Sequence, residues 1–199
     1  MIKKFNDYNS VSTGSDYKRL PKGGYIMLIR DAYTTQTSKG KDAVIVEADI
    51  AEGDYRGFFT DRHNADTRAE KKWPFQGRMV LTIPTDDGSK GDNYLKTLLK
   101  RFTTALEESN PGYVFDWDEK KFIGKRIGAV YGLEEYKDKK SGDYKMSARW
   151  SFVCSVQDIK TGNFQIPKDK TISQAPTAYA GSMDFMKMSD SDKDELPFR

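Results

Sequence analysis

Residues 23–60, with the sequence GGYIMLIRDAYTTQTSKGKDAVIVEADIAEGDYRGFFT, decide the fold of this 199-residue chain. The run 25–33 is apolar and rich in β-forming residues, with two glycines before it and the polar SKGK turn after it. In residues 43–50 a period of two predicts a second, half-buried strand. An AEGD turn then leads to the aromatic run 55–59, which we expect to be a third strand. Such a meander cannot close its own core, so later segments must cover it.

The composition bounds the class of protein. Hydrophobic residues make up 37% of the chain and charged residues 32%, which predicts a globular part with disordered ends. No apolar run approaches the length of a membrane span, and the first residues lead into polar sequence without a signal-peptide core. The single cysteine, Cys154, allows no internal disulfide, so a reducing cytoplasm is the expected location. The single histidine, His63, is expected in a loop, and zinc sites or histidine-dependent triads are excluded unless His63 itself serves.

The later elements are a strand, a helix and a hairpin. Residues 79–83 are a short apolar run that indicates another strand, and residues 93–108 carry one apolar stripe at helical spacing. A single-turn helix is expected to start at Asp116. Residues 126–136 and 144–156 predict a long hairpin joined by the turn KDKKSGD, with the alternate residues from Tyr144 to Val156 facing the core.

The order of strand, strand, strand, helix, strand, strand is that of an OB-fold, a five-stranded Greek-key barrel with its helix between strands three and four. We therefore predict a mainly β protein with one OB-fold domain over residues 23–167. Residues 1–22 form a polar leader on this interpretation. Residues 168–199 are expected to be a flexible linker and an acidic, disordered C-terminal tail.

Charge is distributed unevenly between the body and the tail. Residues 182–199 contain five acids and three bases, and subtracting these from the 30 acids and 33 bases of the chain leaves 25 acids and 30 bases in residues 1–181. The body thus carries about +5 and the tail −2. This asymmetry predicts an anionic partner for the body.

Basic and aromatic residues predict where that partner binds. Cations neutralise phosphates and flat aromatic faces stack on bases, and in OB-folds the two basic hairpin turns would flank the groove. Of Phe58 and Phe59, we expect Phe58 to point outward. Trp73 and Phe75 leave two interpretations open, a base-stacking arm or a plug that closes one end of the barrel. The candidate nucleic-acid-binding residues are Lys39, Lys41, Tyr55, Arg56, Phe58, Arg62, Lys71, Lys72, Trp73, Lys137, Lys139, Lys140, Lys145 and Arg149.

The C-terminal sequence SDSDKDELPF resembles the acidic tail of bacterial single-stranded DNA-binding proteins, in which acids precede a hydrophobic-Pro-Phe tip. The segments LPKGGY and AEGDYRGFF are similar to phage single-stranded DNA-binding proteins of replication modules. One departure is Arg199, which follows Phe198, whereas the family pattern ends on the Phe. The residues that match the tail pattern are Asp190, Asp192, Asp194, Glu195, Leu196, Pro197 and Phe198.

The resemblance implies sequence-nonspecific binding of single-stranded DNA during phage replication or recombination in the cytoplasm of a bacterial host. It also implies that the tail recruits replication or recombination proteins. We expect no catalytic residues, no metal and no cofactor, and the sequence leaves homo-oligomerisation open.

Two other classes of protein compete with this interpretation. Glu47 and Asp49 are expected on the water-facing side of one strand, where a metal-dependent nuclease could use them, but no third acid or lysine follows at a recognised spacing. The other alternative is a protein-only adaptor whose tail recruits partners. Such an adaptor would show no salt-sensitive affinity for DNA.

Overall fold

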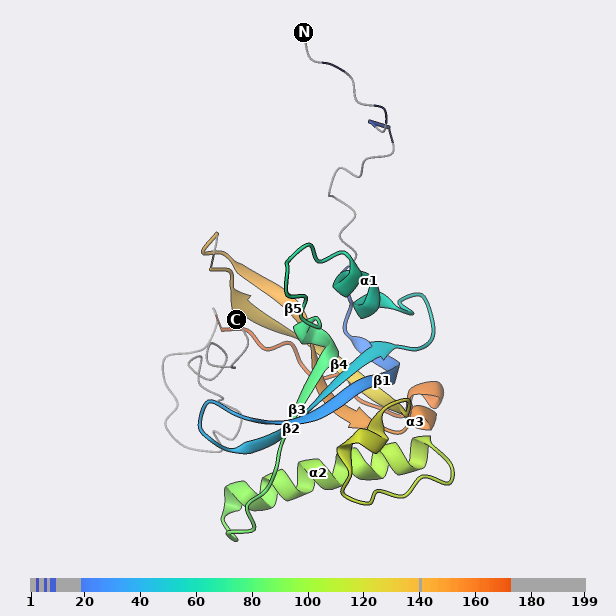
Figure 1. Ribbon diagram of the computed structural model, residues 1–199, viewed down its shortest axis with the longest axis vertical. Coiled ribbons are helices and arrows are strands. Elements are labelled where there is room, and N and C mark those ends of the chain that lie inside the picture. Colours follow the sequence, from blue (N-terminus) through green and yellow to red (C-terminus); the bar gives the residue numbers. More distant parts are fainter. Residues whose placement is uncertain (1–2, 4–5, 7, 10–18, 140, 173–199) are drawn as a thin grey trace.

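The computed structural model describes residues 3, 6, 8–9, 19–139 and 141–172 (Figure 1). The tail residues from Asp190 to Phe198 and Lys140 lie outside this part of the chain. The strands are β1 (Gly23–Gln36), β2 (Asp42–Ile50), β3 (Arg78–Thr82), β4 (Arg126–Lys137) and β5 (Tyr144–Cys154). The helices are α1 (Phe58–Asn64), α2 (Lys90–Ser109) and α3 (Val156–Thr161), with short 3-10 turns η1 (Phe75–Gly77) and η2 (Glu119–Phe122).

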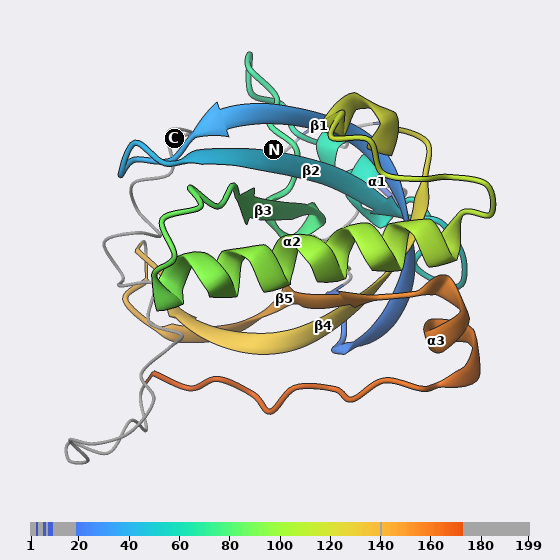
Figure 2. The ribbon, with the colours of Figure 1, turned by 90° about the horizontal axis from the view of Figure 1, so that it is seen from below.

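The five strands form one antiparallel sheet in the order β3-β2-β1-β4-β5, with the long helix α2 between β3 and β4 in the chain (Figure 2). The number of strands in the sheet and the position of the long helix between its third and fourth strands are as predicted. Within the described residues no hydrogen-bonded pairing joins β3 to β5, so the sheet is not closed and the expectation of a closed barrel is wrong. One reason is that β3 is short, with only 5 residues. In addition, η1 rather than β3 contacts β5, through the hydrogen bond from Gln76 to Ser147.

The third strand is not where the sequence predicted it. The aromatic run 55–59 leads into helix α1 because Gly57 takes a left-handed conformation (φ 77°) that turns the chain. Asp49 then accepts hydrogen bonds from the backbone nitrogens of Phe59 (2.9 Å) and Thr60 (3.1 Å) in the first turn of that helix. His63 lies in α1 rather than in a loop, and the third strand is β3.

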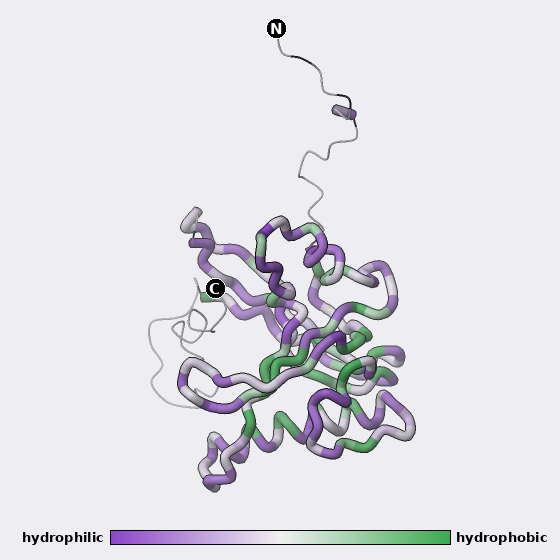
Figure 3. The backbone as a smooth tube through the Cα atoms, in the orientation of Figure 1, coloured by the Kyte–Doolittle hydropathy of each residue, from purple (hydrophilic) through white to green (hydrophobic). Residues whose placement is uncertain are grey.

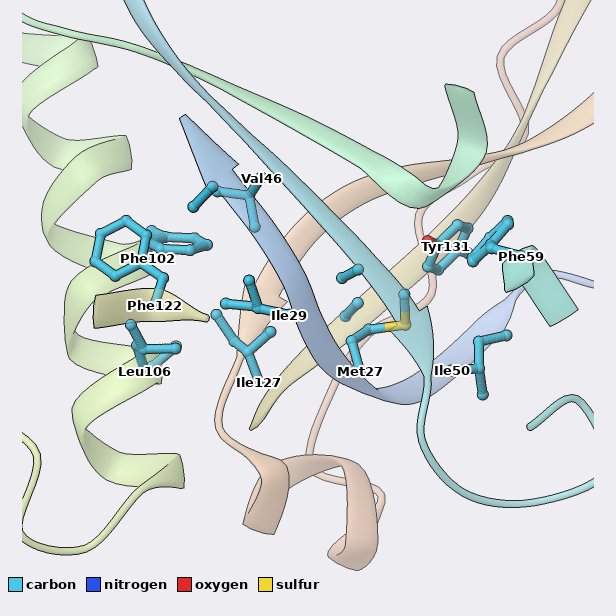
Figure 4. Close-up of a cluster of buried hydrophobic side chains, with 14 of the residues drawn as sticks. Met27, Ile29, Val46, Ile50, Phe59, Phe102, Leu106, Phe122, Ile127 and Tyr131 are labelled. Atoms are coloured by element: carbon cyan, nitrogen blue, oxygen red, sulfur yellow. The ribbon is translucent and has the colours of Figure 1, made fainter. Parts of the chain in front are cut away.

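The core extends from α2 across the sheet to Phe58 and Phe59 of α1, and the face of β2 that was predicted to be buried is part of it (Figure 4). Phe102 and Leu106 on α2 pack with Phe122 of η2 against the sheet, and the rings of Phe102 and Phe122 are 5.3 Å apart. Sheet residues in this core include Met27, Ile29, Val44, Val46, Ala48, Ile50, Ile127, Ala129 and Tyr131.

A bulge changes the face of β5 that meets the core. On β4, Tyr131 lies opposite Trp150 and the residue before it, Val130, lies opposite Phe152. Ser151 of β5 therefore has no partner residue on β4, which is a β-bulge. The predicted core face therefore holds for Ala148 and Trp150 and then shifts by one residue, while Tyr144 at the start of β5 is exposed. Val153, rather than Phe152, packs against the core.

A strap, residues 163–172, follows α3 and runs back along β4 (Figure 2). A Cβ atom on Gly24 would lie 2.4 Å from the Phe164 ring, and one on Gly132 would lie 2.6 Å from Pro167. Lys170 extends the sheet at the β4 edge, because it exchanges backbone hydrogen bonds with Leu133 (2.9 Å) and Glu135 (2.8 Å). The glycines therefore leave room for the strap, which the sequence did not predict.

Candidate nucleic-acid interface

Two basic hairpin tips project from the same end of the molecule (Figures 1 and 2). In the β1–β2 turn Lys39 and Lys41 are exposed, and a hydrogen bond from Thr37 N to Lys41 O (2.8 Å) closes the turn. At the β4–β5 tip Lys137 and Lys139 are exposed as well. Figure 3 shows both tips as mainly hydrophilic. These two tips give one end of the sheet a pair of cationic arms.

The other lysines predicted in the second hairpin are Lys140 and Lys145. Lys140 lies outside the described residues. Lys145 forms an ion pair with Asp138, and the hydrogen bond between them raises the pKa of the Lys145 ammonium. A phosphate would have to compete with Asp138 for Lys145.

The aromatic run before and inside α1 belongs to the core rather than to the surface. Phe58 and Phe59 are both buried, so the expectation that Phe58 points outward is wrong. Tyr55 is half-buried, and its ring meets the Phe58 ring edge-on with centroids 5.9 Å apart. The Arg62 guanidinium covers the Phe58 ring at 4.5 Å from its centroid, and Arg56 is exposed on the turn before α1. Of these residues, the two arginines carry the groups that a ligand can reach.

Trp73 is half-buried and packs into the fold between α1 and the end of β2. Its indole nitrogen donates a hydrogen bond to Ala48 O (3.3 Å), its ring lies 5.5 Å from the His63 ring, and it packs against the core. Lys71 donates to a backbone carbonyl at the end of α1 (3.2 Å), and Lys72 is half-buried. This stretch therefore fastens the α1–η1 segment to the end of β2.

Phe75, two residues further on, has the opposite environment. Its side chain is 49% exposed, and the Arg149 guanidinium carbon lies 4.3 Å from the ring centroid. Burial lowers the pKa of Arg149, while Glu134 acts against this lowering from 3.9 Å. Phe75 thus presents an open aromatic ring with a cation behind it. The pairing joins a residue of η1 to one of β5, across the open side of the sheet.

Gln76 bridges this open side. Its side-chain oxygen accepts a hydrogen bond from Arg62 (2.7 Å), and its side-chain nitrogen donates to Ser147 of β5 (2.8 Å). Its backbone oxygen accepts from the hydroxyl of the buried Tyr131 (2.8 Å). We call these three contacts the Gln76 latch. Gln76 was not among the predicted site residues, and a lone glutamine in a polar loop carries no sequence signal for such a role.

The two carboxylates of the nuclease alternative have partners within the fold. Glu47 pairs with Arg78 at 2.8 Å and accepts a longer hydrogen bond from Tyr33 (3.3 Å). Asp49 is buried and caps α1, so the expectation that it faces water is wrong. In the part of the chain that the structure describes, no group of three or more His, Cys, Asp or Glu residues is placed to hold a metal ion.

The fold and this surface define the class of protein only as a mostly β, five-stranded antiparallel sheet with one long helix and a basic-aromatic surface at its open side. No protein-family model matches the chain, and none of the curated proteins matches it significantly. No helix among the described residues combines the length and the apolar character that crossing a membrane requires.

Proposed function

We propose that this protein binds single-stranded DNA without sequence preference, as part of a phage replication or recombination module. The observation that carries the proposal is the strand order, in which β1 pairs with both β2 and β4 and α2 separates β3 from β4. An OB-fold has this order, and single strands bind to such domains between the β1–β2 and β4–β5 loops. On this proposal the domain is an OB-type sheet that main-chain bonds leave open between β3 and β5.

The chemistry of the surface supports the same ligand. A single strand offers phosphates and unpaired base faces, and proteins that bind it without sequence preference combine cations with aromatic platforms. Here the exposed lysines of both tips supply the cations, and Phe75 supplies an exposed ring. Duplex DNA hides its base faces, so the aromatic part of this surface favours single strands.

The tail completes the proposal, although it lies outside the described residues. Its acids and the Leu-Pro-Phe sequence would bind replication or recombination proteins that present a basic, apolar pocket. While no DNA is bound, the same acids would compete weakly for the basic body, because the covalent link keeps them at high local concentration.

A fluorescence titration with dT20 and with a 20-base-pair duplex, each at two salt concentrations, tests the proposal. We expect tighter binding of dT20 and a log-log salt slope of about −0.7 for each phosphate neutralised. Equal affinity for the duplex, or a response that is flat with salt, would refute it.

Matched charge variants locate the groove. Replacing Lys39 and Lys41, or Lys137 and Lys139, with alanine should weaken binding and flatten the slope by about 1.4 for two phosphate contacts. The control replaces two exposed lysines elsewhere, Lys100 on α2 and Lys160 on α3. It removes the same charge and should leave the slope unchanged. If both tip variants behave like this control, the groove does not run between the tips.

A further inference from the structure

We infer that Phe75 and Arg149 form a subsite for one step of a single-stranded nucleic acid, in which Phe75 stacks on a base and Arg149 binds the neighbouring phosphate. The inference rests on the proposed function and names two residues that would contact the single strand. Neither the hairpin lysines nor the tail is part of this subsite, which lies on the open side of the sheet between η1 and β5.

The ring of Phe75 has one face available. Its side chain is 49% exposed, and none of the other described aromatic rings contacts it. The Arg149 guanidinium covers the other face at 4.3 Å from the centroid. A base that stacks on the open face would complete a sandwich of base, ring and cation. Base stacking on a single aromatic side chain is a sequence-tolerant contact because every base has such a face.

Arg149 has unused hydrogen-bond donors. Its ionic partner among the described residues is Glu134, whose Oε2 lies 3.9 Å from Nε, which is too long for a hydrogen bond. The Glu134 carboxylate is also held by Lys170 at 2.5 Å. A guanidinium stays charged in proteins, and a half-buried cation without close acceptors carries a desolvation cost that a bound anion would offset. The side chain is 26% exposed, so a phosphate can reach it.

The Gln76 latch fixes the two residues relative to each other. Gln76 follows Phe75 directly, and Ser147, which accepts its hydrogen bond (2.8 Å), is two residues from Arg149 on the same strand. Residues two apart on a strand share a face, so the latch aligns η1 with the face of β5 that carries the guanidinium. The subsite is therefore formed before a ligand arrives, which lowers the entropic cost of binding.

This geometry also determines which parts of a nucleotide the subsite can recognise. The base and the guanidinium lie on opposite sides of the Phe75 ring, so Arg149 cannot reach the edge of the base that stacks there. Its donors are left for a backbone oxygen, and Arg-phosphate pairs are often bidentate. The ligand class is thus a flexible single strand, recognised through its base face and its phosphate and not through its sequence.

Two variants with different signatures test the subsite on dT20. Phe75→Ala should weaken binding roughly 5- to 150-fold, the range for losing one stacked base, without changing the salt slope. Arg149→Gln should weaken binding and reduce the slope by about 0.7, as expected for one lost phosphate contact. Phe75→Tyr keeps the ring face and should bind like the wild type. Arg149→Lys keeps the charge, so its salt slope should match that of the wild type. This variant separates the loss of the charge from any loss of stability in Arg149→Gln.

The control is Trp117→Ala, because Trp117 is a 79% exposed aromatic residue outside the open side of the sheet. Its affinity for dT20 should match that of the wild type. Unchanged affinity in both Phe75→Ala and Arg149→Gln, while wild-type protein binds dT20, would overturn the subsite and leave the proposed function standing. An equal loss in Phe75→Ala and Trp117→Ala would overturn it too. Absence of dT20 binding by the wild type at low salt would overturn both.

Discussion

Removal of the Asp49 carboxylate should destabilise the domain far more than the loss of a surface acid. The side chain is 6% exposed and accepts hydrogen bonds from Phe59 N (2.9 Å), Thr60 N (3.1 Å) and the Thr60 hydroxyl. Asp49→Ala leaves two backbone donors of the first turn of α1 without an acceptor, and each such donor costs about 1–3 kcal/mol when buried. Phe59 N is buried and Thr60 N is half-buried, so we expect the free energy of unfolding to fall by ~3–5 kcal/mol. That is a large share of the ~5–15 kcal/mol that stabilises a typical domain.

Urea unfolding followed by circular dichroism measures this loss. Asp42→Ala is the control, because Asp42 lies at the exposed start of the same strand and should change stability by less than about 0.5 kcal/mol. A loss below ~1 kcal/mol in Asp49→Ala, with an unchanged m-value, would show that water replaces the carboxylate and that α1 does not depend on it.

Three further predictions address packing, the thiol and the tail. Gly128→Ala should cost ~1–3 kcal/mol, because a Cβ there would lie 2.6 Å and 2.8 Å from two backbone carbonyl oxygens. Gly91→Ala on α2, where a Cβ would meet only Ser89 Oγ at an ordinary 3.8 Å, should leave the urea midpoint unchanged or raise it. Burial, reinforced by a nearby acid, raises the pKa of the Cys154 thiol from its ordinary 9.0 to about 11. Alkylation at pH 8 should therefore be about 100-fold slower in the native protein than in urea, because the thiolate fraction falls tenfold for each pH unit; equal rates would contradict the burial of the thiol. Deletion of residues 182–199 should leave the unfolding curve unchanged, strengthen dT20 binding modestly at low salt and abolish pull-down of replication proteins, and identical partners with and without the tail would refute its recruiting role.

The parts of the fold that the sequence predicted are those with a hydrophobic period or a compact apolar run. The strand at 43–50, the long helix and the final hairpin have such a period, and β2, α2, β4 and β5 confirm them. The apolar runs at 25–33 and 79–83 are confirmed as β1 and β3. The prediction for the aromatic run 55–59 was wrong because we expected a strand there. Two adjacent residues of a strand point to opposite faces, so we expected Phe58 to point outward and Phe59 inward. In α1 Phe58 and Phe59 are both buried, which a helix allows.

Other errors came from contacts between distant parts of the chain. The burial of Asp49 depends on a helix that begins nine residues later, and the shifted face of β5 depends on a bulge at Ser151 that no residue pattern marks. The same holds for the sheet closure, since the latch at Gln76 takes the place of main-chain pairing between β3 and β5.

The candidate site divides in a similar way. The exposed lysines of both hairpin tips follow from turn composition, and the structure places them at one end. Arg149 was predicted as a lone cation and Phe75 as either arm or plug. Their pairing needs the tertiary path of η1 past β5, which local sequence does not encode.

The strap has a consequence for the order in which the domain folds. It joins the two extremes of the described body, since Lys22 pairs with Asp169 across 147 residues and Phe164 fills the space beside Gly24. All five strands precede residue 164 in the chain, but β5 ends at Cys154, so β5 and the strap leave the ribosome almost together. Contacts of such long sequence separation form slowly. We therefore expect docking of the strap to be the last step of folding, and a sheet without it leaves the face beside Gly24 and Gly132 open to other chains.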